Sequence, residues 1–130
     1  MGDGDHGWAA AEFCNVLRQL LVCEDHAGLS LFAGVPAEWL QPGRVTSIHG
    51  APTFYGRLTA TLEADVRGIA ARWNLEPWSG EENCRISISL PAGITDADFV
   101  AGNERSQRRS RVRCQLRGEM FFERQKEAVV

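Results

Sequence analysis

A regular alternation of apolar and polar residues between Leu58 and Glu76 constrains the fold more than any other feature. Apolar residues recur at every second position from Leu58 to Ala64, and again from Ile69 to Leu75. The positions between them carry mostly Thr, Glu, Arg and Asn, and a turn-forming stretch at 65–68 separates the two runs. Two runs of period two joined by a short turn predict an antiparallel β-hairpin. We expect its apolar inner face to contain Trp73 and its outer face to be polar.

Shorter stretches at 29–33, 45–49 and 86–90 also predict strands, and Pro and Gly residues separate them. Strands spaced by about 10 to 15 residues favour an antiparallel β-sandwich over alternating strands and helices. We therefore predict a mainly β protein with three parts. These are an N-terminal helix (1–27), an antiparallel β-sandwich core (28–93) and an Arg-rich C-terminal segment (94–130). In the last part Val112, Cys114 and Leu116 alternate as one strand, which Met120 to Phe122 extend or pair with, unless the segment stays disordered.

The stretch from Gly7 to Glu24 predicts an amphipathic helix. At 100° per residue its Phe, Val, Leu, Cys and several Ala side chains fill one arc of about 180°. Glu12, Asn15, Arg18 and Gln19 lie in the opposite half. An arc this wide needs a large apolar partner, so what covers it is the central question about the chain.

Composition excludes several classes of protein. No apolar run reaches the ~20 residues that a membrane span needs, because Arg18 and Gln19 interrupt the best candidate. The N-terminus lacks the basic flank and apolar region of a secretory signal, so we expect a cytoplasmic protein. The cysteines are scattered and the histidines lack metal-ligand spacing, which predicts no metal, no cofactor and buried free thiols. The cysteines are Cys14, Cys23, Cys84 and Cys114.

Three groups of residues are candidates for chemistry or binding. Glu24-Asp25-His26 and Glu81-Glu82 resemble acid clusters, but turn and loop positions favour a solvated role for both. Phe54, Tyr55 and Trp78 lie in predicted loops and could stack on a sugar. The third group is the segment 105–117, which has six Arg and no acid. Under a nucleic-acid hypothesis the phosphates would be bound by Arg105, Arg108, Arg109, Arg111 and Arg113. The net charge of −3 and the lack of interleaved aromatics favour a solvated tail instead.

The order of several motifs resembles a known family. HGWAAAEFCNVLRQLLVCED followed by GLSLFAGVPAEWLQPG is similar to the junction between the last toroid helix and the C-terminal β-sandwich cap of bacterial six-hairpin (α/α)6 glycoside hydrolases. APTFYGRLTATLEAD, RWNLEP and SISLPAG resemble later strands of that cap. The likeness covers residues 6–93, and the Arg-rich segment departs from the family pattern.

The resemblance carries its own implications. Family members place residues near the sugar pocket at the entrance to this helix, which here are His6 and Trp8. The helix face would pack on the other toroid helices, and the catalytic carboxylates would come from the barrel that this chain lacks. The chain would then be a truncated remnant or a free-standing cassette, non-catalytic in either case.

Three hypotheses follow. The favoured one is a non-catalytic accessory or structural β-sandwich module related to glycoside hydrolases and associated with carbohydrate. The second is a small oligomerising, partner-binding protein whose helix face meets a second copy. The third is a nucleic-acid binder acting through the Arg segment. None of them predicts which sugar would bind.

Overall fold

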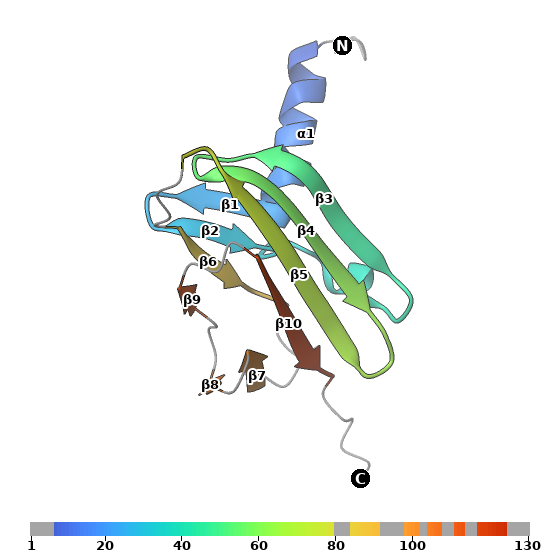
Figure 1. The fold of residues 1–130 in the computed structure, drawn as a ribbon. Helices are drawn as coiled ribbons and strands as arrows, with labels where there is room; N and C mark the ends of the chain where they lie inside the picture. The colour runs from blue at the N-terminus through green and yellow to red at the C-terminus, as the bar shows by residue number, and fades with distance from the viewer. Residues whose placement is uncertain are drawn as a thin grey trace.

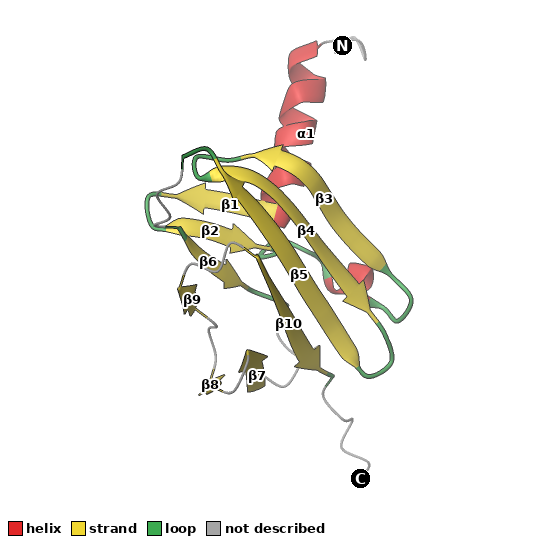
Figure 2. Cartoon of the chain, viewed as in Figure 1, coloured by secondary structure: helices red, strands yellow, loops and turns green. Residues whose placement is uncertain are grey.

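Two β-sheets lie face to face in the computed structural model, and one helix, α1 (Gly7–Leu21), extends from them (Figures 1 and 2). The structure describes residues 7–79, 84–91, 98–101, 104–107, 111–113 and 117–124, with the backbone alone described between 98 and 113. The predicted mainly β architecture with one N-terminal helix is confirmed.

The smaller sheet has the strand order β1-β2-β6-β9. Its strands are β1 (Val22–Asp25), β2 (Gly28–Leu31), β6 (Arg85–Ile88) and β9 (Arg111–Arg113). The strands β1 and β2 form an antiparallel hairpin, whereas β2 and β6 pair in parallel. Between β2 and β6 the chain crosses to the other sheet and returns, which allows two neighbouring strands to run in the same direction. Local alternation carries no information about such a pairing.

The larger sheet has the order β3-β4-β5-β10-β7-β8. The 3-10 helix η1 (Ala37–Leu40) leads into it, and the strands are β3 (Val45–Pro52), β4 (Gly56–Ala64), β5 (Gly68–Pro77), β7 (Asp98–Ala101), β8 (Glu104–Gln107) and β10 (Arg117–Glu123). The predicted hairpin is present as β4 and β5, paired from Gly56 opposite Pro77 to Ala64 opposite Ile69.

The core lies between the sheets. Trp73 is 4% exposed and points into it, as its phase with Ile69 and Leu75 predicts. The inner face of the smaller sheet contributes branched aliphatic residues from three strands, which are Val22, Leu29, Leu31, Ile86 and Ile88. Alternate residues of β4, β5 and β10 contribute the opposite wall, including Met120 and Phe122. Apolar residues at every second position thus place one face of each sheet against the other.

The helix ends at Leu21, three residues earlier than the sequence predicts. The interval Val22–Asp25 belongs to β1 and not to the helix, and Val22 is fully buried. The Asp25 carboxylate accepts hydrogen bonds from the N–H groups of Ala27 (2.7 Å) and Gly28 (3.0 Å), which closes the turn into β2. Pairing with β2 and burial of Val22 therefore outweigh continuation of the helix, although the helical periodicity extends through Cys23.

Two other expectations need correction. Cys14 and Cys23 are exposed, so among the described cysteines only Cys84 fits the prediction of buried thiols, and Cys114 lies outside the described residues. The last strand, β10, pairs with β5 along its whole length, from Arg117 opposite Asn74 to Glu123 opposite Gly68. It does not pair with β9, which lies in the other sheet beside β6. The segment 94–130 thus supplies strands to both sheets.

Asp65 organises the turn between β4 and β5. Its Oδ1 accepts hydrogen bonds from the backbone N–H groups of Gly68 (2.8 Å) and Arg67 (2.7 Å). These bonds, that from Gly68 first, hold the pKa of the Asp65 carboxyl below its usual 3.8, because they stabilise the charged form. An acid whose pKa is lower in the folded state stabilises that state above its unfolded pKa and loses the effect as the pH falls.

We expect Asp65→Asn to reduce the free energy of unfolding near neutral pH and to lose that effect as the pH falls below 3.8. Urea unfolding at about pH 6 and about pH 3 measures the difference in free energy of unfolding between the wild type and the variant at each pH. The contributions of the other acids cancel in this difference because both proteins share them. A difference of equal size at the two pH values would contradict the role assigned to the Asp65 charge.

Candidate functional site

The turn between β3 and β4 presents aromatic side chains on a rigid backbone. The Thr53 hydroxyl accepts hydrogen bonds from the N–H groups of Tyr55 and Gly56, both at 3.1 Å, and donates to the Gly56 carbonyl at 2.7 Å. Gly56 has φ 154°, and a Cβ there would lie 2.1 Å from the Glu76 carbonyl oxygen. Only glycine fits at this close approach of the backbones. The sequence Thr-x-x-Gly therefore fixes the turn.

Two exposed aromatic residues meet here, Phe54 in the turn itself and Trp78 directly after β5. Together with Tyr55 we name them the aromatic loop. Phe54 is 82% exposed and Trp78 is 57% exposed. The indole Nε1 of Trp78 donates a hydrogen bond of 2.6 Å to the carbonyl oxygen of Thr53, the residue before Phe54. This bond fixes the orientation of an indole that the core does not hold.

A network of polar groups ties the aromatic loop to the base of α1. Glu24 accepts from the Arg18 guanidinium (3.0 Å) with one carboxylate oxygen and from the Phe54 N–H (2.7 Å) with the other. Arg18 also donates to the Pro52 carbonyl at 2.7 Å. Because the Arg18–Glu24 pair is partly buried, it is screened less than a surface pair. We call Arg18 and Glu24 the clamp.

Tyr55 is the second point of attachment between the loop and the smaller sheet. Its hydroxyl donates to the Asp25 carbonyl at 2.6 Å. Desolvation raises the pKa of the Tyr55 phenol above its usual value, and the negative charges of Asp25 and Glu24 act in the same direction. The phenol is thus a neutral donor that ties the turn to β1, and the stacking role of the Tyr55 ring stays a prediction.

The remaining sequence candidates do not join this cluster. His6 lies outside the described residues, and the exposed Trp8 lies ten positions from Arg18, about 15 Å along α1. Glu81 and Glu82 are also outside the described part. Arg105 lies in β8, and Arg111 and Arg113 lie in β9, but the side chains of these three residues are not described. Arg108 and Arg109 lie outside the described residues altogether. Their nucleic-acid role stays a prediction.

Several acids of the described residues have structural partners. Glu24, which the sequence suggested as a solvated turn former, instead holds Arg18 and the Phe54 N–H. No group of three metal-ligating side chains occurs among the described residues. The role of Glu24 was not visible in the sequence, because its partner Phe54 is thirty positions away.

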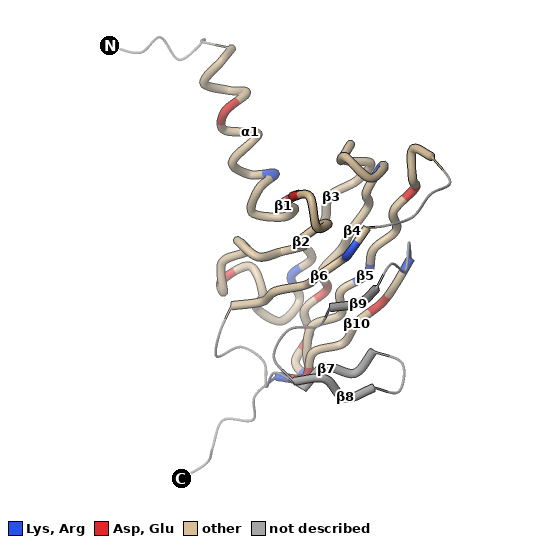
Figure 3. Tube along the Cα trace, turned by 90° about the vertical axis from the view of Figure 1, so that its left-hand side faces the viewer, with Lys and Arg blue, Asp and Glu red and all other residues tan. Residues whose placement is uncertain are grey.

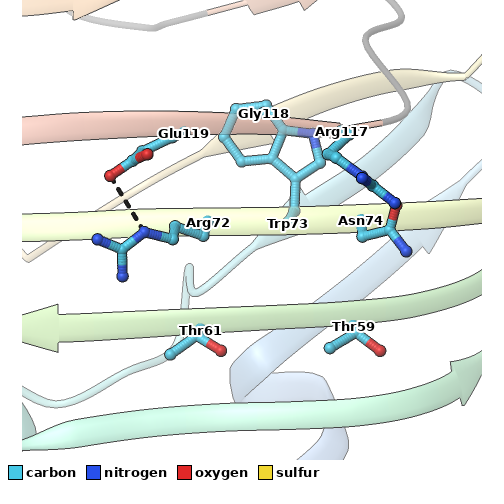
Figure 4. Close-up of a pocket in the computed structure, with 8 residues that line it drawn as sticks. All are labelled: Thr59, Thr61, Arg72, Trp73, Asn74, Arg117, Gly118 and Glu119. Carbon is cyan, nitrogen blue, oxygen red and sulfur yellow. Dashed lines mark hydrogen bonds and ion pairs between the residues drawn. The ribbon is translucent and has the colours of Figure 1, made fainter.

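A groove of about 530 Å³ lies on the outer face of the larger sheet, across β4, β5 and β10 (Figure 4). Arg72 forms ion pairs there with Glu63 and with Glu119, the latter at 3.0 Å, and Arg117 donates to Asn74 at 3.1 Å. The hydrogen bond to Glu63 and both negative charges raise the pKa of Arg72. Since these side chains are exposed and satisfy one another, the groove is a solvated sheet face.

The helix α1 forms a second exposed feature. None of its residues is buried, and it extends away from both sheets as a mostly uncharged element (Figure 3). Phe13 is 63% exposed, and Val16 and Leu17 are exposed beside it. Its last turn is attached to the sandwich: the carbonyls of Leu20 and Leu21 accept from the N–H groups of Gly34 and Phe32, and Arg18 donates to the Pro52 carbonyl. The wide apolar arc expected from the sequence is therefore exposed around Phe13, whereas Leu20 and Leu21 at its C-terminal end are half-buried.

Comparison of the chain with protein-family models, with curated proteins and with solved structures found no match. The fold, the exposed helix α1 and the aromatic loop define the class of protein by structure alone. It is a β-sandwich with an exposed amphipathic helix and an ordered aromatic turn. None of the described helices has the length and apolar character to cross a membrane.

Proposed function

We propose that this chain is a non-catalytic β-sandwich module that docks on a helical domain through the apolar face of α1. The single observation that carries the proposal is that face, because Phe13, Val16 and Leu17 are exposed together on a helix without a buried residue. Exposed apolar patches of this kind are typical of interaction sites. The resemblance to the cap of six-hairpin glycoside hydrolases supports a barrel of that class as the helical domain.

The width of the face favours a helical domain over a single partner helix. Two paired helices need only the narrow seam of a coiled coil, whereas the arc on α1 spans about 180°. Such an arc has room for two neighbouring helices. Ala9 and Ala10 lie within it, and small residues allow helices to approach closely.

The clamp supports docking because it fixes the direction of α1. On a helical wheel Arg18 lies about 130° from the centre of the apolar arc, so its bonds to Glu24 and Pro52 leave the arc accessible. A helix held at one end loses less freedom on binding than a detached one. The sandwich would thus serve as a rigid base for the docking helix.

The structural use of several described acids supports a module without a reaction of its own. Glycoside hydrolysis needs two carboxyl groups facing each other across the sugar bond. Glu24 serves the clamp, Asp65 a turn, and Glu63 and Glu119 the ion pairs of the outer sheet face. The catalytic groups would come from the partner domain.

A second copy of this chain is the alternative occupant of the face. The same exposed side chains favour it, and association of two copies through α1 needs no other protein. The two proposals differ in stoichiometry and in their response to a helical partner, so one experiment separates them.

We expect a six-hairpin glycoside hydrolase barrel, truncated before its last helix, to form a one-to-one complex with this chain. The double substitution Phe13→Asp with Leu17→Arg should abolish the complex, because it places charge in the centre of the face. Since both side chains are exposed, the free energy of unfolding should change by only about 0.5 kcal/mol. Size-exclusion chromatography with light scattering measures the complex, and urea unfolding measures stability.

Val66→Asp is the matched control, because Val66 is 78% exposed in the turn between β4 and β5, away from α1. If the chain is a dimer that does not bind the barrel, and the double substitution makes it a monomer, the second copy would be the occupant of the face. If the wild type is a monomer that does not bind the barrel and elutes as the double variant does, both proposals would be contradicted.

A further inference from the structure

We propose that Phe54 and Trp78 form a stacking site for a neutral oligosaccharide, separate from the docking face of α1. Phe54 lies in the turn between β3 and β4 and Trp78 directly follows β5, and 82% and 57% of their surfaces are exposed. A buried Phe ring stabilises the folded state, and Phe54 loses most of that stabilisation because 82% of its surface is exposed. Single exposed apolar residues are ordinary, but the bond from the Trp78 indole to the carbonyl of Thr53, the residue before Phe54, brings two exposed aromatic residues to the same turn.

The backbone that carries these rings is ordered before any ligand binds. The hydroxyl of Thr53 closes the turn through three hydrogen bonds, and Glu24 holds the N–H of Phe54. The indole of Trp78 is held by its Nε1 bond to Thr53, which leaves its ring surface partly exposed. A preorganised surface loses little conformational entropy on binding, which favours a weakly binding ligand such as a sugar.

The surroundings of the rings favour a sugar over other ligands. An aromatic face carries partial negative charge and attracts the C–H groups on one side of a sugar ring, while the sugar hydroxyls need polar neighbours. The neighbouring positions are polar: Arg57 is opposite Glu76 in the sheet, and Glu24 and Asp25 flank the turn. The centre of a protein interface would instead be depleted in charge.

The charges also determine which sugars fit. With Arg18 and Arg57 against Glu24, Asp25 and Glu76, the surroundings of the aromatic loop carry no excess of positive charge. Phosphates of nucleic acids and carboxylates of uronic acids need such an excess. The ligand class is therefore a neutral oligosaccharide.

The test is affinity electrophoresis of the full chain in gels that contain laminarin, xyloglucan, arabinoxylan or galactomannan. We expect at least one of these neutral polysaccharides to retard the protein. Both Phe54→Ala and Trp78→Ala should weaken that retardation by about tenfold, as loss of a central aromatic contact does in other interfaces. Trp78→Phe, which keeps a ring but loses the bond to Thr53, should weaken it less than Trp78→Ala.

Trp39→Ala and Val66→Ala are the matched controls, because both residues are exposed outside the aromatic loop and should not affect retardation. In protein labelled with 5-fluorotryptophan, the ¹⁹F resonance that Trp78→Phe removes should shift when the retarding polysaccharide is added. The docking variant Phe13→Asp with Leu17→Arg should bind the polysaccharide as the wild type does, which separates this site from the proposed function.

Several outcomes would overturn the proposal. One is no retardation in any of the four gels. Another is retardation that Phe54→Ala and Trp78→Ala leave intact, or stronger retardation by polygalacturonate or single-stranded DNA than by the neutral polysaccharides. A loss of self-association in Phe54→Ala without a change in sugar binding would identify the aromatic loop as a protein contact instead.

Discussion

Replacing Gly118 with alanine will destabilise the sandwich by about 3 kcal/mol, through overpacking of the core and loss of Trp73 burial. Gly118 lies directly opposite Trp73 in the pairing of β10 with β5. A Cβ at this position would lie 2.1 Å from Cζ2 of the indole and 2.6 Å from two further ring carbons. Since Trp73 is 4% exposed, the ring has no solvent-side space into which to move. Either the indole leaves its place or β10 separates from β5.

Urea unfolding measures the loss of stability, and near-ultraviolet circular dichroism reports the environment of the buried indole. Gly118→Ala in a Trp73→Leu background is the control, because a smaller side chain leaves room for the added methyl group. In that background Gly118→Ala should reduce the free energy of unfolding clearly less than it does in the wild type. The difference would be a coupling energy of about 1–2 kcal/mol between the two positions. Equal costs in the two backgrounds would show that the indole is not the obstacle.

Replacing Thr53 with valine will cost about 2–3 kcal/mol, because two backbone N–H groups lose their acceptor. Valine has nearly the shape of threonine, so packing is kept while the hydrogen bonds from Tyr55 and Gly56 disappear. Thr53 is 7% exposed, so water does not readily replace the lost oxygen. The loss of order in the turn should also weaken polysaccharide retardation.

Thr53→Ser is the control for this prediction, since serine keeps the oxygen and should lose less than about 1 kcal/mol. Urea unfolding of the three proteins gives the comparison. If valine and serine cost the same, the hydrogen bonds of the Thr53 hydroxyl do not hold the turn, and its rigidity must have another source.

Part of the candidate site could be predicted from the sequence. Phe54, Tyr55 and Trp78 fall between runs of strand-like alternation, which places them in loops. The sequence does not show that the Trp78 indole bonds to Thr53, twenty-five positions earlier, or that Glu24 holds the Phe54 N–H. Nor does it show that the Tyr55 phenol bonds to the Asp25 carbonyl, thirty positions earlier. Contacts between distant positions depend on how the sheets pack.

The helix shows the same division. Its apolar arc was predicted from spacing alone, since the period of 3.6 residues is a local property of the backbone. Its end was predicted three residues too late, because Val22 joins a strand whose partner follows in the chain. Whether the arc is covered could not be read from the pattern, because a buried and an exposed amphipathic helix have the same spacing.

The sequence by itself determined the β4–β5 hairpin, the inward position of Trp73 and the amphipathic character of α1, because each follows from the repeat of side chains along one stretch of backbone. The tertiary structure alone decided the parallel pairing of β2 with β6, the place of β10 beside β5, the position of Gly118 opposite Trp73, and the clamp between α1 and the aromatic loop. These depend on segments distant in the chain meeting in space, which local periodicity does not encode.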